Sequence, residues 1–315
     1  VTTKKTIRKA MKHFQNILFV IQGHEIADGA FRQAVNIAKN TDGNITYLAL
    51  HPEFKGDLAG FKDTYQKNIK NALVTKLKAA GIEGEPNIIF ESKTPHFVTI
   101  VQYVLQNDYD LVVKAAEESD DNHKKGLKSL DMSLLRKCPC PLWLCRDTEH
   151  GANPTILTAI DPESEDEEGH NLSIKLLKLG DFVATALDGT HKIIACWEFE
   201  HESYLRDSGF GRIEGSKVDQ MILDTQKKHR QGVEDLIQKS GISAPEIVHE
   251  RGKAYDVIPN YTDKFSADLV VMGTVARTGI PGFLIGNTAE NILQNLSCSL
   301  VAVKPPGFES PIKAY

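Results

Sequence analysis

A glycine-rich segment in the last third of the 315-residue chain has the residue types of an anion site. It begins at Met272-Gly273, directly after an apolar run at 269–271, and leads into a helical pattern that starts near Gly286. Exposed backbone N–H groups and the positive end of a helix dipole favour a bound phosphate at such a junction. The segment therefore predicts a phosphate-binding loop between a strand and a helix.

The same residues also allow an explanation without a ligand. Asn287 is a good N-cap residue for the helix, and Glu290 stands three positions later. The two side chains would then form a capping box, in which each satisfies backbone N–H groups at the start of the helix. On the sequence alone, a phosphate site and a self-capped helix both remain open.

Three of the five cysteines crowd one segment, at Cys138, Cys140 and Cys145. Structural zinc takes four ligands, usually in two spaced pairs. Here two prolines flank Cys140 at the start of an apolar run, so we expect no metal site. The odd number of cysteines also argues against a secreted disulfide framework.

The remaining reactive side chains show no catalytic spacing. His96, His170 and His249 are not tied by position to a nucleophile and a base. The acidic run at 163–168 has one sign of charge, and such a run usually faces water. We therefore expect no catalytic residue.

An internal repeat shows which elements position the glycine-rich segment. Short apolar runs at 16–22 and 154–161 each have the pattern of a buried first strand. Later segments also correspond, since Asp110-Leu-Val-Val in the first half matches Asp268-Leu-Val-Val in the second. Each half is therefore predicted to alternate strands and helices in the order β-α-β-α-β-α-β-α-β.

The first helix of each half is predicted to end at an Asp-Gly pair, Asp42-Gly43 and Asp188-Gly189, where glycine takes the left-handed conformation. Continuous Val, Ile and Leu strands are typical of parallel sheets covered by helices on both faces. We predict two tandem Rossmann-like α/β domains, each with a five-stranded parallel sheet and helices on both faces. Their boundaries are 1–149 and 150–315, because the residues between are polar and include Gly and Pro.

Composition and charge argue against several classes of function. Apolar residues make up 41% and charged residues 25%, which is an ordinary globular composition. The net charge is −5, and direct nucleic-acid binding depends on clustered Lys and Arg, so we expect none. The chain has no run of about 18 apolar residues, so we expect no membrane segment and a cytoplasmic location.

The tandem repeat, the Gly-Asn-Thr-Ala-Glu stretch and the Val-Lys-Pro ending together resemble the universal stress protein family over nearly the whole chain. That family's nucleotide motif is Gly, two residues, Gly, nine residues, Gly, then Ser or Thr. Gly273, Ala276 and Gly286 keep this spacing, but Ala276 replaces the second glycine. Asn287 replaces the hydroxyl residue, and Thr288 follows it directly.

The resemblance implies a ligand pocket in the second half, with ATP and Mg²⁺ as its occupant. The residues matched to this pocket are Asp161, Met272, Gly273, Ala276, Gly286, Asn287 and Thr288. Asp161 matches the acidic residue that contacts the adenosine part of the ligand. Residues 272–273 match the strand end that lines the pocket, and residues 286–288 match the turn on the phosphate side.

The first half departs from the motif more strongly. Its equivalent stretch, at 115–129, has lost both anchoring glycines and carries four carboxylates, which would repel a polyphosphate. Gln22 stands where Asp161 stands in the second half. We therefore expect the first half to bind no nucleotide.

The resemblance implies a non-enzymatic protein that supports survival under stress, including exposure to DNA-damaging agents. It also implies contact between last strands, which a tandem chain can make as an intramolecular pseudo-dimer or in a homodimer of tandems. An adenine-nucleotide hydrolase-type enzyme with weak ATP hydrolysis is one alternative, although acidic residues follow Asp161 in place of a Ser/Gly-rich loop. An interaction scaffold that binds an apolar or mixed ligand near Phe283 and Leu284 is another.

Overall fold

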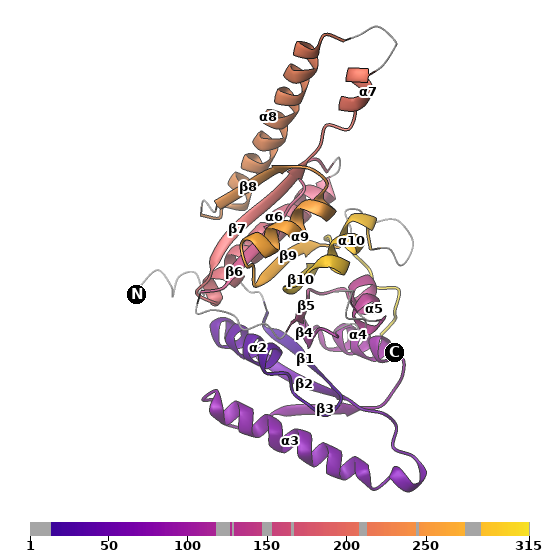
Figure 1. The fold of residues 1–315 in the computed structure, drawn as a ribbon. Coiled ribbons are helices and arrows are strands. Elements are labelled where there is room, and N and C mark those ends of the chain that lie inside the picture. The colour runs from indigo at the N-terminus through magenta and orange to yellow at the C-terminus, as the bar shows by residue number, and fades with distance from the viewer. Residues whose placement is uncertain are drawn as a thin grey trace.

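The computed structural model describes residues 14–117, 127, 129–146, 153–164, 167–207, 213–243, 246–274 and 285–314. These residues form one ten-stranded sheet with helices on both faces (Figure 1). The strand order is β3-β2-β1-β4-β5-β10-β9-β6-β7-β8. The two halves of the chain therefore follow the same strand order from opposite edges of the sheet.

The first half contributes the sheet's indigo-to-magenta part in Figure 1. Its strands are β1 (Asn16–Gln22), β2 (Asn44–Leu50), β3 (Asn87–Glu91), β4 (Leu111–Ala115) and β5 (Leu142–Cys145). Its helices are α2 (Asp28–Thr41), α3 (Phe61–Ala79), α4 (His96–Asn107) and α5 (Ser129–Lys137), with a short 3-10 helix η1 (Gly56–Leu58).

The second half repeats this series of elements, with an α-helix, α7, in the place of η1. Its strands are β6 (Thr155–Ala159), β7 (Thr190–Trp197), β8 (Glu246–Arg251), β9 (Leu269–Gly273) and β10 (Ser299–Val303). Its helices are α6 (Glu167–Ala186), α7 (Glu202–Asp207), α8 (Gly215–Ser240), α9 (Ala254–Lys264) and α10 (Asn287–Asn295). Helix α7, which the repeat did not predict, projects with the start of α8 from the body of the molecule (Figure 1).

The inner strands, such as β1, β4, β9 and β10, are buried on both faces, which explains their continuous apolar sequences. In β1, Ile17, Phe19 and Ile21 face one hydrophobic core, whereas Leu18 and Val20 face the other. The first core lies under α2, α3, α6 and α8, and the second under α4, α5, α9 and α10. The predicted α/β architecture, with a mostly parallel sheet and helices on both faces, is confirmed.

The two halves join through their last strands. Trp143 of β5 pairs with Val301 of β10, and this pairing is antiparallel, whereas the other neighbouring strands described are parallel. On one face, the Phe14 and Phe182 rings meet edge to face at 5.8 Å. Asn40 also donates a hydrogen bond of 2.9 Å to the Ala186 carbonyl oxygen. Sheet pairing and side-chain packing thus connect the halves within one chain.

The Asp-Gly helix ends differ from the prediction. The left-handed residues are the aspartates, with φ of 54° at Asp42 and 56° at Asp188. A Cβ atom on Gly43 would lie 2.4 Å from the Phe14 carbonyl oxygen, and one on Gly189 would lie 2.3 Å from that of Pro154. Glycine is therefore required at both turns because the backbone of the preceding strand passes close by, and the left-handed assignment was wrong.

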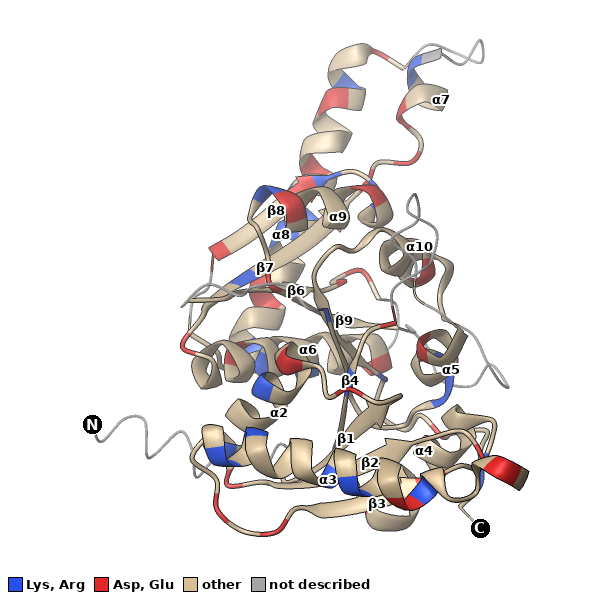
Figure 2. Cartoon of the chain, turned by 60° about the horizontal axis from the view of Figure 1, so that its bottom comes forward, with Lys and Arg blue, Asp and Glu red and all other residues tan. Residues whose placement is uncertain are grey.

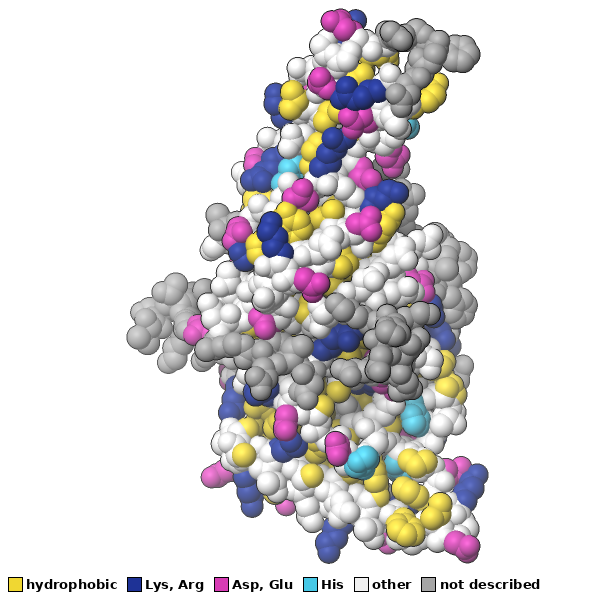
Figure 3. Space-filling view, in the orientation of Figure 1, with side chains coloured by type: hydrophobic (Ala, Val, Ile, Leu, Met, Phe, Trp, Pro, Cys, Tyr) yellow, Lys and Arg dark blue, Asp and Glu magenta, His cyan; other side chains and the backbone are white. Residues whose placement is uncertain are grey.

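The predicted domain boundary lies mostly outside the described residues, so the ranges 1–149 and 150–315 stay a prediction. Within the described ranges, no helix is long and apolar enough to cross a bilayer. Acidic and basic side chains are interspersed along the helices (Figure 2). Figure 3 shows the same mixture of charges over the upper part of one face of the molecule.

Candidate functional site

A cavity of about 620 Å³ opens at the carboxyl ends of β6, β7 and β9. This is the edge where open parallel sheets place their ligands, near the point at which strand order reverses. Its apolar wall comprises Ala159, Leu172, Leu176, Ile194, Ile258, Met272 and Ile292. The volume lies within the range of small-molecule and cofactor sites.

The structure brings most of the sequence-predicted residues together here. Those lining the cavity are Asp161, Met272, Gly273, Gly286, Asn287 and Thr288. Ala276 lies outside the described residues. Gly273 has a packing reason as well, because a Cβ atom there would lie 2.8 Å from Leu172 Cδ2 of α6. A close approach between β9 and α6 therefore shapes the cavity floor.

The start of α10 differs from the predicted capping box. Gly286 is the N-cap residue, with φ −59° and ψ 142°, and within the described part of the chain no side chain caps the helix. Asn287 is already helical, and Glu290 pairs with Arg136 of the first half, at 3.2 Å between Nη2 and Oε1. Because no side chain among the residues described around α10 caps it, its first N–H groups can donate to an acceptor in the cavity.

A threonine that sequence reasoning missed lies beside this helix end. Thr274 follows β9, lines the cavity and is 1% exposed. Its carbonyl oxygen accepts a hydrogen bond from Gly286 N at 3.0 Å. Its Oγ1 atom is buried and has no hydrogen-bond partner among the described residues. Buried hydroxyls are usually paired, so this one is suited to contact a bound molecule.

Acidic side chains form the opposite rim. The carboxylates lining the cavity are Asp161, Glu163, Glu198 and Glu200. Asp161 Oδ1 accepts a hydrogen bond of 2.9 Å from Glu163 N, which holds the turn after β6. Burial, followed by the nearby Asp161 charge, raises the pKa of Glu163. Lys253 is the only Lys or Arg among the described lining residues. A polyanion is therefore best accommodated at the α10 end.

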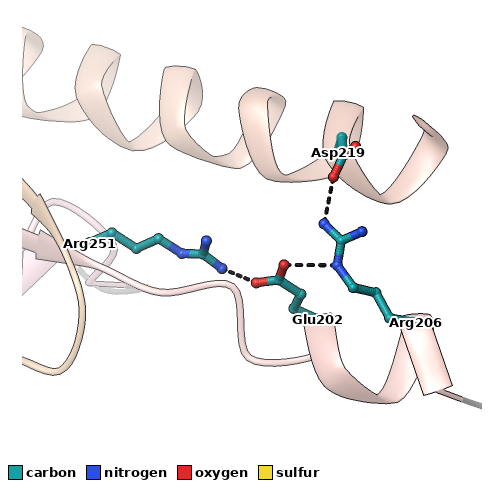
Figure 4. A network of polar contacts seen from close by, with 4 residues as sticks. All are labelled: Glu202, Arg206, Asp219 and Arg251. Carbon is teal, nitrogen blue, oxygen red and sulfur yellow. Dashed lines mark hydrogen bonds and ion pairs between the residues drawn. The ribbon is translucent and has the colours of Figure 1, made fainter. Parts of the chain in front are cut away.

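The segment after β7 completes the rim with Glu200 and His201. It continues into α7, where Glu202 pairs with Arg206, at 2.9 Å between Oε1 and Nε, and with Arg251 at the end of β8. Arg206 also contacts Asp219 of α8, so four charges link the three elements (Figure 4). Exposed ion pairs add little stability, and this network links the segment after β7 to β8 and α8.

The described cavity wall lacks an activated nucleophile. Burial raises the pKa of the Cys196 thiol to about 12, so it stays protonated at neutral pH. The pKa of Lys253 is raised, chiefly by its hydrogen bond with Tyr255, so this side chain stays a cation. Among the described residues, no three His, Cys, Asp or Glu side chains are grouped to hold a metal ion.

The fold and the strand-end cavity define a tandem Rossmann-like α/β protein. The model of the universal stress protein family matches residues 13–146 and 152–304. The chain therefore belongs to the universal stress protein family, and this membership supports a role in the response to stress.

Curated relatives match this chain over nearly its whole length. Universal stress protein E of Photorhabdus laumondii is 26% identical, with 96% of this chain and 99% of the relative covered. Universal stress protein E of Escherichia coli K12 is also 26% identical, at 96% and 98% coverage. A crystal structure of a functionally unknown protein from Pseudomonas aeruginosa PAO1 aligns with a TM-score of 0.71 and 25% identity, covering 94% of this chain and 95% of that one.

Proposed function

We propose that this chain is a non-enzymatic stress-response protein whose second half binds a nucleotide in the cavity between β6, β9 and α10. The observation that carries the proposal is the convergence of strand-end and helix-start residues on one cavity of about 620 Å³. Asp161 would face the nucleoside part, and the start of α10 would face the phosphates. Regulation by ligand occupancy, rather than turnover, would be the activity.

ATP with Mg²⁺ is the proposed ligand. The carboxylates of Asp161 and Glu163 would repel phosphate groups that carry no metal ion. Mg²⁺ bound to the phosphates would reduce their net negative charge. The uncapped amides of α10 and the unpaired Thr274 hydroxyl would supply hydrogen bonds at the phosphate end. This chain's residues would bind and orient the nucleotide, and none is assigned a chemical step.

Thermal unfolding with and without ATP and Mg²⁺ tests the proposal. Nucleotide at 100 times its dissociation constant should add about 2.7 kcal/mol to the free energy of unfolding. Gly286→Ala should change the apo stability little, because its Cβ atom would lie no closer than 3.9 Å to any described atom. It should weaken the response to nucleotide, because the added methyl group stands at the cavity beside the start of α10. Gly60→Ala, at the N-cap of α3, is the matched control and should respond like wild type.

A neutral ligand with apolar and polar parts is the second candidate, and the acidic rim together with the apolar wall favours it. An unchanged melting temperature at millimolar ATP, together with stabilisation by an uncharged adenosine, would support this candidate over the nucleotide. Absence of both responses would contradict ligand binding of the adenosine class in this cavity.

A further inference from the structure

The first half contains a buried ion pair at the place where the second half has its cavity. Lys114 of β4 and Asp131 of α5 approach to 2.9 Å, and their side chains are 2% and 0% exposed. Burying two charges costs desolvation free energy, so the pair is weak evidence for a gain in stability. Its position in the fold indicates a different role.

The internal repeat identifies that position. Strand β4 pairs with β1 as β9 pairs with β6, with Ile17 opposite Leu111 and Ile156 opposite Leu269. Lys114 is the fourth residue of β4, as Met272 is of β9. Asp131 is the third residue of α5, as Ala289 is of α10. Met272 and Ala289 both line the cavity of the second half, so the ion pair occupies the corresponding space of the first half.

The contacts of Asp131 are those of a bound anion. Its Oδ2 atom accepts a hydrogen bond of 2.7 Å from the backbone N of Glu117, in the loop that follows β4. The Lys114 ammonium donates to the Ala115 carbonyl oxygen at 2.8 Å and faces Asp131 Oδ1. Glu117 in turn accepts a hydrogen bond from Gln22 at the end of β1. Loop, strand end and helix are therefore bridged by the chain's own side chains.

We propose that the first half is a ligand site filled from within, in which the Asp131 carboxylate takes the position of an anion and Lys114 neutralises it. The two halves then share a fold but not an accessible site, and external ligands reach the second half alone. This inference concerns the first half and does not depend on what the second half binds.

Chemical rescue of Asp131→Ala in the full-length chain tests the proposal. The variant leaves the Lys114 ammonium and the Glu117 N–H group without their carboxylate, so its midpoint of urea unfolding should fall below that of wild type. Sodium formate should raise the midpoint, and formate at ten times its dissociation constant should lower the unfolding equilibrium constant about elevenfold. The reference is sodium chloride at equal ionic strength.

Two control variants separate anion binding from general salt effects. Asp131→Asn keeps a side chain of the same size, so it leaves no space for formate. Formate should therefore stabilise this variant no more than it stabilises wild type. Lys114→Met/Asp131→Ala introduces the residues of the second half, removes the buried charge, and should be more stable than Asp131→Ala without responding to formate. Equal formate responses in wild type and Asp131→Ala, or a double variant no more stable than the single one, would overturn the proposal.

Discussion

Two buried threonine hydroxyls of the second half have opposite surroundings. Thr274 Oγ1 has no partner among the described residues, whereas Thr158 Oγ1 lies 2.8 Å from His191 Nε2. Both side chains are at most 1% exposed. This difference is expected if the Thr274 hydroxyl hydrogen-bonds to a ligand and the Thr158 hydroxyl stabilises the fold.

Thr274→Val should therefore raise the free energy of unfolding of the apo protein by about 1 kcal/mol, because a buried unpaired hydroxyl is removed. The same change should weaken stabilisation by ATP. Thr158→Val should instead lower the free energy of unfolding by about 1–3 kcal/mol, since it leaves the His191 nitrogen unpaired. Urea unfolding of both variants checks this, and a destabilised Thr274→Val would argue against an unpaired hydroxyl.

A pair of histidines, one on α8 and one on β8, predicts a pH dependence. His229 Nδ1 and His249 Nε2 lie 2.8 Å apart, and burial lowers the pKa of both rings below 6.5. Between 6.5 and the lowered folded pKa, the unfolded chain binds more protons, so stability falls as the pH falls through this window. Unfolding measured from pH 7.5 to 5 should show a shallower loss in His249→Asn, and an unchanged slope in that variant would contradict the assignment.

The site could be predicted from sequence where strand ends and spacing determine it. Asp161, Gly273 and Gly286 were assigned through the family resemblance, and they line one cavity because each lies at a strand end or at the helix start on the carboxyl edge of the sheet. Thr274 was missed because its missing partner is visible only in three dimensions. Lys253 follows β8 and could have been found by the same strand-end rule, had that rule been applied to every strand.

The Asp-Gly turns predict a matched pair of destabilising variants. Gly43→Ala and Gly189→Ala would each place a Cβ atom within 2.4 Å of a carbonyl oxygen of the neighbouring strand segment. Because backbone must move to accept the methyl group, each should cost about 1–3 kcal/mol of stability. Gly60→Ala, which meets nothing within 4 Å, should be near neutral, and thermal unfolding distinguishes the three. Wild-type stability in the first two would contradict the close approach.

The strands and most helices could be predicted because their apolar residues, continuous in strands and periodic in helices, indicate which positions are buried. The left-handed residue of each Asp-Gly turn could not, since Asp and Gly both tolerate that conformation and only the neighbouring backbone decides between them. Helix α7 also escaped prediction, because its six residues are too few to show a helical period. Its Glu202 side chain pairs with Arg251, which is distant in the sequence.

Across the chain, repetition of one fold coexists with divergence of its two sites. Antiparallel pairing of β5 with β10 and the Arg136–Glu290 ion pair join the halves, so the first half supports the start of α10. Met272 and Ala289 leave space in the second half, where Lys114 and Asp131 fill it in the first. The chain should consequently hold one ligand, not two.

Calorimetric titration with ATP and Mg²⁺ tests most directly whether the chain has one nucleotide site, in its second half. The titration compares wild type with Met272→Lys/Ala289→Asp, which transfers the ion pair of the first half to the second. Wild type should bind one nucleotide per chain, and the folded double variant should bind none. Two nucleotides per chain, or undiminished binding by the double variant, would contradict a single site in the second half.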